Sequence, residues 1–405
     1  MKQFLKLKST EVYFTVVIKI LLALAIWLTL ESAPLLTIWL PVAFFSSRIF
    51  LGGFFPNVSD NIDKYTFILI LQLIMFPALV SYLYFINTES YGYLILVIFL
   101  LGVIDAYYAP TVNALIPDVV REEQLHSAYR ISFFLMAVSN AAGLTIGFAG
   151  YEVFNLNYLI LVLLAACVPM FALNFGLRKV CFDFEPSKLF VNPLKNFREY
   201  RAVKFEFEWS ICSLIINSVV VAFSTFIIPL AVKEVMDASS IYVGLMEAAV
   251  SLGVIIGSIY VHKELSRFLS DRVLVIASLL VLSFCFLLYS FALNKFAWMI
   301  TSIIFGVALV VNNTTVESKR SIAISEKNRG MFQTIHSLLI QAGVPVGLLI
   351  SKVISDRLSI EVSLVAGFLT LFVVVVYLAC SKHTTDFLRT PLDKIGGYYD
   401  RHYGY

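Results

Sequence analysis

Long apolar runs separated by short polar segments make up most of this 405-residue chain. A helix that spans a bilayer needs about 20 consecutive apolar residues, and twelve runs approach or reach that length. They predict an all-α membrane protein with twelve transmembrane helices. The predicted spans lie near 11–31, 34–56, 66–86, 92–115, 128–152, 157–177, 209–232, 240–261, 273–293, 296–316, 331–354 and 361–380.

A polar stretch at 178–208 divides these runs into two sets of six. Seven Lys or Arg residues lie in this stretch, as is typical of a cytoplasmic loop. Two halves of nearly equal length are typical of transporters built from repeated bundles. We therefore predict an N-terminal six-helix bundle at 1–177, a cytoplasmic central loop at 178–208, a C-terminal six-helix bundle at 209–380 and a cytoplasmic tail at 381–405.

The distribution of positive charge predicts the orientation in the membrane. Cytoplasmic segments of membrane proteins carry an excess of Lys and Arg. With the N-terminus inside, the inside segments hold 24 of the 30 Lys and Arg residues and the outside segments hold 4. The other two lie within predicted helices. A multi-pass protein with both termini cytoplasmic is therefore predicted.

Composition supports the membrane location and excludes several functional classes. The chain is 60% hydrophobic and 14% charged, with a mean hydropathy of +0.87, whereas soluble domains are about 25% charged. This excludes a soluble protein, a disordered chain and a nucleic-acid-binding protein. The five cysteines are scattered and form no CxxC pair, so neither a metal site nor a disulfide framework is predicted. Without a Walker A, HExxH, GxSxG or GxGxxG sequence, we expect no cofactor and no enzymatic activity.

Four ionisable residues lie inside predicted spans, where charges are costly and usually functional. Lys19 and Asp105 lie at comparable depths, and Lys19 is roughly 12 Å above the cytoplasmic end of its helix at 1.5 Å per residue, so they can form an ion pair. Such a pair either neutralises itself permanently or takes part in proton coupling, and Lys19 can instead extend to the membrane interface. Glu247 has no basic residue at its depth, as a proton carrier requires. The proton-coupling candidates are thus Asp105, Glu247 and Lys19, and the fourth residue is Arg48.

Polar and aromatic residues on the first and fourth helices of each set are candidates for lining a substrate cavity. Amide and aromatic side chains suit a bulky amphipathic ligand, because they stack and form adaptable hydrogen bonds. The alternative for each aromatic residue is packing against lipid or at the interface, since the chain has 35 Phe and 20 Tyr. The cavity candidates are Trp27, Tyr107, Tyr108, Asn217, Asn312 and Asn313, and Asn140, His336 and Gln341 lie on helices that can border the cavity.

Three pairs of glycines at GxxxG spacing lie on the fifth, eighth and eleventh predicted helices. This spacing lets helices approach closely in lipid. The symmetric positions favour a contact between the two bundles, and the alternative is tight packing inside each bundle. The pairs are Gly143 and Gly147, Gly253 and Gly257, and Gly343 and Gly347.

Four segments carry recognisable patterns: PLLTIWLPVAFFSSRIFLGGFFPNVSD at 34–60, ALIPDVVREEQLHSAYRI at 114–131, GLMEAAVSLGVIIGS at 244–258 and RGMFQTIHSLLIQAGVPVG at 329–347. They resemble the second helix, the helix 4–5 connection, the eighth helix and the entry to the eleventh helix of the major facilitator superfamily. The similarity is to its macrolide-efflux and enterobactin-exporter branch, and it extends from residue 11 to about residue 380.

The loop after the second predicted helix, Asp-Asn-Ile-Asp-Lys at 60–64, resembles the cytoplasmic loop motif of this superfamily. It departs from the usual pattern at Asn61, where Arg is expected, and at Pro56, where Gly is usual. An acid at this place can pair with a base or cap a helix N-terminus, and the alternative is a solvated turn. The resemblance implies a gating motif of Arg48, Gly52, Asp60, Asp63 and Lys64.

The resemblance implies a two-bundle, twelve-helix transporter of the bacterial cytoplasmic membrane that works by alternating access. The branch implies export of an amphipathic small molecule or peptide, such as an antimicrobial or a siderophore, in exchange for protons. The implied partners are this substrate, protons and the lipid bilayer. Two alternatives stay open, namely proton-coupled uptake of a nutrient and a non-transporting membrane enzyme or assembly factor.

Overall fold

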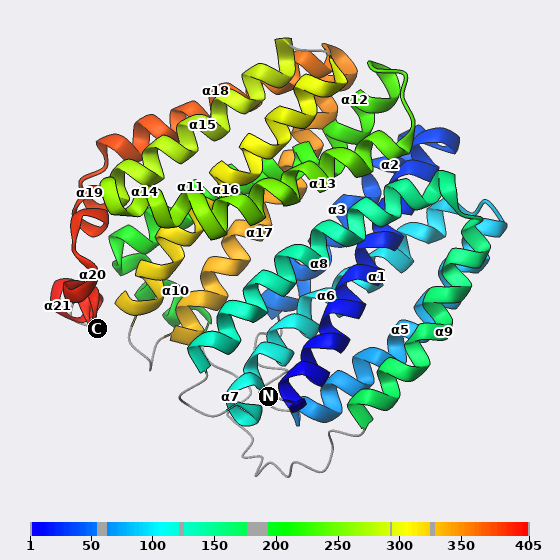
Figure 1. Ribbon diagram of the computed structural model, residues 1–405, viewed down its shortest axis with the longest axis horizontal. Coiled ribbons are helices and arrows are strands. Elements are labelled where there is room, and N and C mark those ends of the chain that lie inside the picture. Colours follow the sequence, from blue (N-terminus) through cyan, green and yellow to red (C-terminus); the bar gives the residue numbers. More distant parts are fainter. Residues whose placement is uncertain are drawn as a thin grey trace. The chain divides into compact units, whose positions relative to one another are not determined.

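A computed structural model describes residues 2–54, 63–120, 125–175, 193–291, 294–324 and 329–403, and these residues are almost entirely helical (Figure 1). Clustering of contacts divides the chain into two compact units. Unit 1 comprises Met1–Phe190 and Ala238–Gly244, and unit 2 comprises Val191–Asp237 and Leu245–Tyr405. The boundary at residues 190 and 191 lies inside the polar stretch noted at 178–208.

Unit 1 contains eight described helices before residue 176. α1 packs along α8 and also contacts α6 and α9, while α3 and α5 both pack against α6. These helices are α1 (Lys2–Ser32), α2 (Pro34–Thr37), α3 (Trp39–Phe54), α5 (Lys64–Asn87), α6 (Tyr91–Ala114), α7 (Ile116–Val119), α8 (Leu125–Val153) and α9 (Leu156–Phe175).

Unit 2 contains most of the remaining elements, and the first residues of α13 belong to unit 1. Within unit 2, α11 packs along α17, and α15 packs against α16 and α18. The elements are α10 (Pro193–Ala202), α11 (Lys204–Ala222), η2 (Phe223–Ile227), α12 (Ile228–Glu234), α13 (Ser240–Ile256), η3 (Gly257–Val261), α14 (His262–Phe268), α15 (Asp271–Phe291), α16 (Lys295–Ala323), α17 (Arg329–Arg357), α18 (Ile360–Cys380), α19 (Lys382–Arg389), α20 (Leu392–Ile395) and α21 (Tyr398–Tyr403).

The helices confirm the predicted all-α, twelve-helix plan. In the described part of the chain, eleven helices are long and apolar enough to cross a bilayer, and the remaining predicted span corresponds to a shorter apolar helix at Pro34–Phe50. The span predicted at 209–232 contains a π-helical turn at Phe223–Ile227, which ends two residues before Pro229. Proline lacks the backbone N–H that an α-helical hydrogen bond needs, and a wider turn is one way for the helix to continue past it.

The six glycines of the GxxxG pairs all face helices of their own unit. A Cβ at Gly143 would lie 2.6 Å from the Cβ of Lys19 on α1, and one at Gly147 would lie 2.6 Å from the Cβ of Ala23. In unit 2, the glycines of α13 and η3 face α16, and those of α17 face α11. The prediction that these glycines form a contact between the bundles is therefore wrong, and the alternative of tight packing inside each bundle holds.

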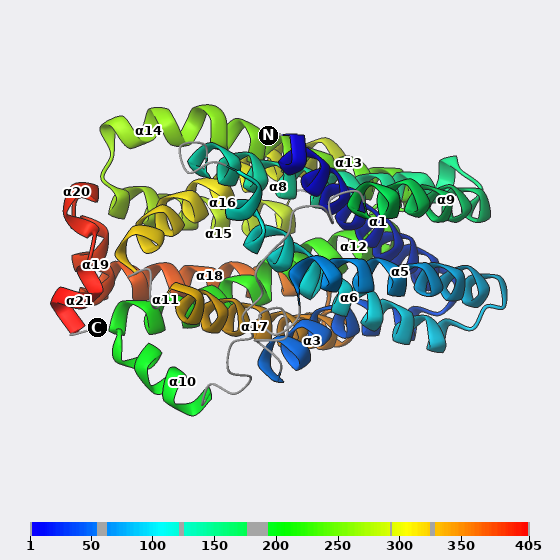
Figure 2. The same cartoon turned by 90° about the horizontal axis from the view of Figure 1, so that it is seen from below.

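The C-terminal segment after α18 folds against unit 2. Figures 1 and 2 show α19, α20 and α21 together at one end of this unit, beside α10 and α11. The ring of Phe387 in α19 stacks on the ring of Phe205 in α11, with centroids 3.7 Å apart, and Tyr399 stacks on Phe332 of α17. The segment predicted only as a tail is thus an ordered part of unit 2.

Candidate functional site

Three charged side chains meet in the interior of unit 1, each from a different apolar helix. Lys19 comes from α1, Arg48 from α3 and Asp105 from α6. The Nζ of Lys19 lies 3.6 Å from Oδ2 of Asp105, which confirms the predicted ion pair. Arg48 Nη2 forms a second ion pair with the same oxygen. The exposed side-chain fractions are 9% for Lys19, 23% for Arg48 and 7% for Asp105, so the three residues form a largely buried charge cluster.

Close helix packing brings these three side chains together. A Cβ at Gly102 on α6 would overlap the side chain of Ser47 and the carbonyl oxygen of Phe44, so only glycine lets α6 approach α3 at this level. Gly143 on α8 has the same role beside Lys19. The ring of Phe44 lies beneath both cations, with its centroid 4.4 Å from Lys19 Nζ and 5.3 Å from Arg48 Cζ. Such a ring stabilises a partly desolvated cation.

Two described residues of the implied gating motif, Arg48 and Asp63, each have partners of their own. The Arg48 guanidinium binds Asp105 in the interior of unit 1. Asp63 caps the N-terminus of its own helix, α5, by accepting hydrogen bonds from the backbone N and the Oγ1 of Thr66, at 2.8 and 2.6 Å. Lys64 is the first residue of that helix. Asp60 lies outside the described residues, and Gly52 lies near the end of α3.

Glu247 is the acidic side chain buried within the spans of unit 2 without an ion-pair partner among the described residues. It lies on α13, is 5% exposed, and its Oε1 has no hydrogen-bond partner. Its backbone carbonyl accepts a hydrogen bond from Ser251.

The structure separates the predicted cavity residues into two kinds. Tyr108 is buried and accepts hydrogen bonds from Gln72 Nε2 at 2.8 Å and from Asn174 Nδ2 at 3.2 Å, so it is engaged inside unit 1. Trp27 is also buried and donates to Glu31 at 2.9 Å. These two side chains pack within their own unit.

The remaining candidates are less fully engaged. Tyr107 is half-buried, with its ring against that of Phe67, and Asn217 is half-buried. Asn312 is buried and donates to the exposed Asn313 at 3.2 Å, but its own Oδ1 has no hydrogen-bond partner. A buried amide oxygen without a partner is costly, so Asn312 stays a candidate for contact with a ligand.

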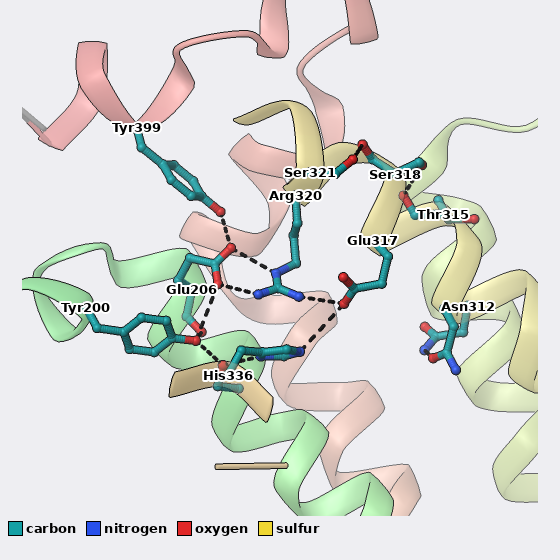
Figure 3. Close-up of polar contacts among 12 residues, drawn as sticks. Tyr200, Glu206, Asn312, Thr315, Glu317, Ser318, Arg320, Ser321, His336 and Tyr399 are labelled. Atoms are coloured by element: carbon teal, nitrogen blue, oxygen red, sulfur yellow. Dashed lines mark hydrogen bonds and ion pairs between the residues drawn. The ribbon is translucent and has the colours of Figure 1, made fainter. Parts of the chain in front are cut away.

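A second cluster of charged residues, which the sequence did not reveal, lies in unit 2 (Figure 3). Glu206 of α11 and Arg320 of α16 are 0% and 1% exposed and form a bidentate ion pair, with Nε–Oε1 at 2.9 Å and Nη2–Oε2 at 2.8 Å. Tyr399 of α21 donates to Oε1, and Tyr200 of α10 donates to Oε2 at 3.3 Å. All four donors therefore converge on one buried carboxylate.

Burial raises the pKa of Tyr200 and of Tyr399, and the nearby Glu206 carboxylate raises each further. Both phenols are therefore protonated at physiological pH and act as donors. Tyr200 lies on α10 and Tyr399 on α21, outside the candidate spans. The Glu206 carboxylate thus joins α10, which precedes the spanning helices of unit 2 in the sequence, to α21, which follows them.

A chain of hydrogen bonds extends from this cluster to a more exposed acid. Tyr200 contacts Ser210, whose Oγ lies 2.6 Å from His336 Nδ1. The Nε2 of His336 lies 3.6 Å from Glu317, which also accepts from Arg320 Nη1 at 2.5 Å. Sequence reasoning placed His336 at the border of the cavity and left Glu206 in the central loop. The apolar runs did not reveal that the two helices extend beyond them: α11 begins at Lys204 and α16 continues to Ala323.

Comparison with known proteins identifies the family of this helical, charge-bearing chain. Residues 37–387 match the family described as transmembrane secretion effector, within the major facilitator superfamily (MFS). The chain belongs to this MFS family. It is accordingly a membrane transporter of the MFS type. No curated protein sequence gives a significant match.

Solved structures support the MFS fold. A bacterial homologue of the human lysosomal transporter Spinster, in an inward-facing and unoccupied conformation, is 14% identical, with a TM-score of 0.68 and coverage of 96% of this chain and 98% of that one. The nucleoside transporter NupG is 14% identical, with a TM-score of 0.66 and coverage of 96% and 100%. The human organic anion transporter MFSD10 is 13% identical, with a TM-score of 0.65 and coverage of 92% and 99%. At such identities these likenesses show the fold alone.

Proposed function

We propose that this MFS transporter exports an amphipathic small molecule or peptide in exchange for protons, by alternating access. The observation that carries the proposal is the buried, unpaired carboxyl of Glu247 in a membrane-spanning helix. An unpaired carboxylate in a bilayer is costly. A carboxyl at this position therefore holds a proton while it is buried and releases the proton when water or a cation reaches it, as antiport requires.

Asp105 supplies the second acid of the proposed coupling mechanism. Its carboxylate is shared by Lys19 and Arg48, and protonation would release both cations at once. Helices that move relative to one another during transport would then exchange one arrangement of this cluster for another. Export as the direction rests on the secretion function in the family's description, and the positive-charge bias supports a cytoplasmic location for both termini.

Proton movement in everted membrane vesicles tests the proposal. Vesicles loaded with a pH-sensitive dye are exposed to three probes that share a fluorophore: dansyl-glycine, dansyl-glycinamide and N-dansyl-ethylenediamine. If the protein is a proton antiporter, at least one probe accumulates in the lumen while protons leave it. Probe that enters the lumen together with protons, in the same direction, would instead support proton-coupled uptake by symport.

Variants distinguish coupling from leakage. We expect Glu247→Gln and Asp105→Asn to abolish probe-dependent proton movement, whereas the matched control Glu264→Gln leaves it unchanged. Glu264 lies on α14 and is more than half exposed in its pair with Arg267. Proton movement that survives in both buried-acid variants would contradict the coupling assignment.

A further inference from the structure

We propose that the cluster of Lys19, Arg48 and Asp105 binds an anionic group of the transported molecule, a carboxylate, phosphate or sulfonate. This inference rests on the proposed transport function and names the substrate class. Two basic side chains share one carboxylate oxygen, and the cluster has a formal charge of +1 when both are protonated.

Three described acidic side chains on α1 and α8 are engaged elsewhere. Glu11 pairs with Lys8. Glu31 accepts hydrogen bonds from Trp27 and Tyr151, and Glu152 accepts them from the backbone N and Oγ of Ser240. None of these described acids compensates the extra cation.

A buried charge without its counterion is costly. An anion that binds at the cluster would remove this cost, so the binding free energy of an anionic ligand would include the relief of an uncompensated charge. A neutral ligand would gain nothing from the cluster, and a cationic one would be repelled. The cluster therefore selects among ligands by the sign of their charge.

The donors that remain unused have the geometry for an anion. Arginine carries five N–H donors in a planar fork that matches carboxylate and phosphate oxygens. The Nη2 of Arg48 contacts Asp105, while its Nε is buried and has no hydrogen-bond partner. Lys19 Nζ lies 3.6 Å from Asp105, which is longer than a hydrogen bond. Arg48 is also the most exposed of the three side chains, which makes it the first contact for an incoming anion.

The apolar surroundings of the cluster suit the rest of an amphipathic molecule. The Phe44 ring lies against both cations, and Phe45 lies beside Arg48 at 5.8 Å. The expected ligand therefore carries an anionic group on an apolar or aromatic body.

Equilibrium binding of the three dansyl probes tests this inference without transport. The full-length protein is placed in nanodiscs of phosphatidylcholine, and binding is followed by dansyl fluorescence anisotropy. Dansyl-glycine carries a carboxylate, dansyl-glycinamide is neutral and N-dansyl-ethylenediamine is cationic. We expect saturable binding that is strongest for dansyl-glycine and weakest for the cation.

Two variants in the cluster and one control outside it locate the preference. Lys19→Met should weaken dansyl-glycine binding by about ten- to a hundredfold, as expected for loss of an interaction with a charged group, and should leave dansyl-glycinamide binding within about twofold. Lys6→Met removes a positive charge from an exposed position on the same helix and should change neither. Asp105→Asn removes the competing carboxylate and should retain or strengthen dansyl-glycine binding. The melting temperature of each variant shows whether it is folded.

The outcomes separate this inference from the proposed function. Equal or weaker binding of dansyl-glycine than of the amide, no saturable binding of dansyl-glycine, or a preference that survives Lys19→Met would overturn the anionic class, whatever the protein does with protons. Competition by phosphatidylglycerol added to the nanodiscs would assign the site to a lipid phosphate and overturn a transported anion. Conversely, an intact anion preference without any coupled proton movement would refute the antiport proposal alone.

Discussion

Replacing Arg320 by Met should destabilise unit 2 far more than the loss of an ordinary ion pair. The change removes the cation and two of the four hydrogen bonds to Glu206, which is 0% exposed. Breaking a buried pair by removing one partner costs about 3–5 kcal/mol, because an uncompensated charge stays behind. We therefore expect Arg320→Met to lower the free energy of unfolding by about 3–5 kcal/mol.

A double variant separates the cost of the stranded charge from the value of the pair. Replacing a buried ion pair by apolar side chains is often neutral or stabilising, so Glu206→Met with Arg320→Met should recover most of the loss. Recovery should stay incomplete, because Tyr399 loses its carboxylate acceptor, and an unsatisfied buried donor costs about 1–3 kcal/mol.

Equilibrium unfolding by SDS in mixed micelles measures these differences, followed by tryptophan fluorescence. Trp209 and Trp298 are both buried in unit 2 and report its unfolding. The control is Arg267→Met. Arg267 and its partner Glu264 are both more than half exposed, so loss of this ion pair should cost less than about 1 kcal/mol. A loss below about 1 kcal/mol for Arg320→Met, or a double variant less stable than the single one, would refute the reasoning.

Three further changes test other contacts. Gly143→Ala places a Cβ 2.6 Å from Lys19 Cβ and should lower the free energy of unfolding by about 1–3 kcal/mol through overpacking. The control Gly92→Ala places a Cβ that meets nothing within 4 Å and should cost little. Equal costs of the two variants in SDS unfolding would contradict the packing argument. Lys319→Met removes an ion pair with Asp271 and hydrogen bonds to the carbonyls of Leu388 and Thr390 at 2.6 and 2.7 Å. Amide hydrogen exchange in α19 should therefore become faster. Unchanged exchange would show that other contacts hold the C-terminal segment. Tyr399→Phe removes one hydrogen bond to a carboxylate and should cost about 1.5–3 kcal/mol while exchange in α21 rises, and an unchanged free energy of unfolding would exclude a structural role for that bond.

The helices could be predicted because each apolar run is long enough to require a spanning helix, and the ion pair of Lys19 and Asp105 followed from their matching depth. Arg48 joined that pair unexpectedly, since depth along a helix does not reveal the rotation that turns a side chain toward Asp105. The glycine pairs showed which helices have a small face, but spacing alone does not identify the helix against which that face packs.

The cluster around Glu206 was missed for a different reason. Hydropathy marks where an apolar run ends, whereas α11 and α16 extend beyond their apolar runs and carry Glu206 and Arg320 with them. Their pairing depends on tertiary contacts, and so does the docking of α21, whose few residues have no strong helical pattern of their own. Such a charge pair within predicted loops is indistinguishable in sequence from two solvated residues.

In the proposed mechanism, a proton carried by a buried acid drives transport. The most direct test compares proton-driven accumulation of dansyl-glycine with its one-for-one exchange in proteoliposomes of the Glu247→Gln variant. We expect the variant to lose accumulation driven by a pH gradient but still to exchange internal for external dansyl-glycine, because the neutral amide preserves the shape of the side chain and cannot carry a proton. Gradient-driven accumulation at the wild-type rate in Glu247→Gln would show that Glu247 does not carry the proton.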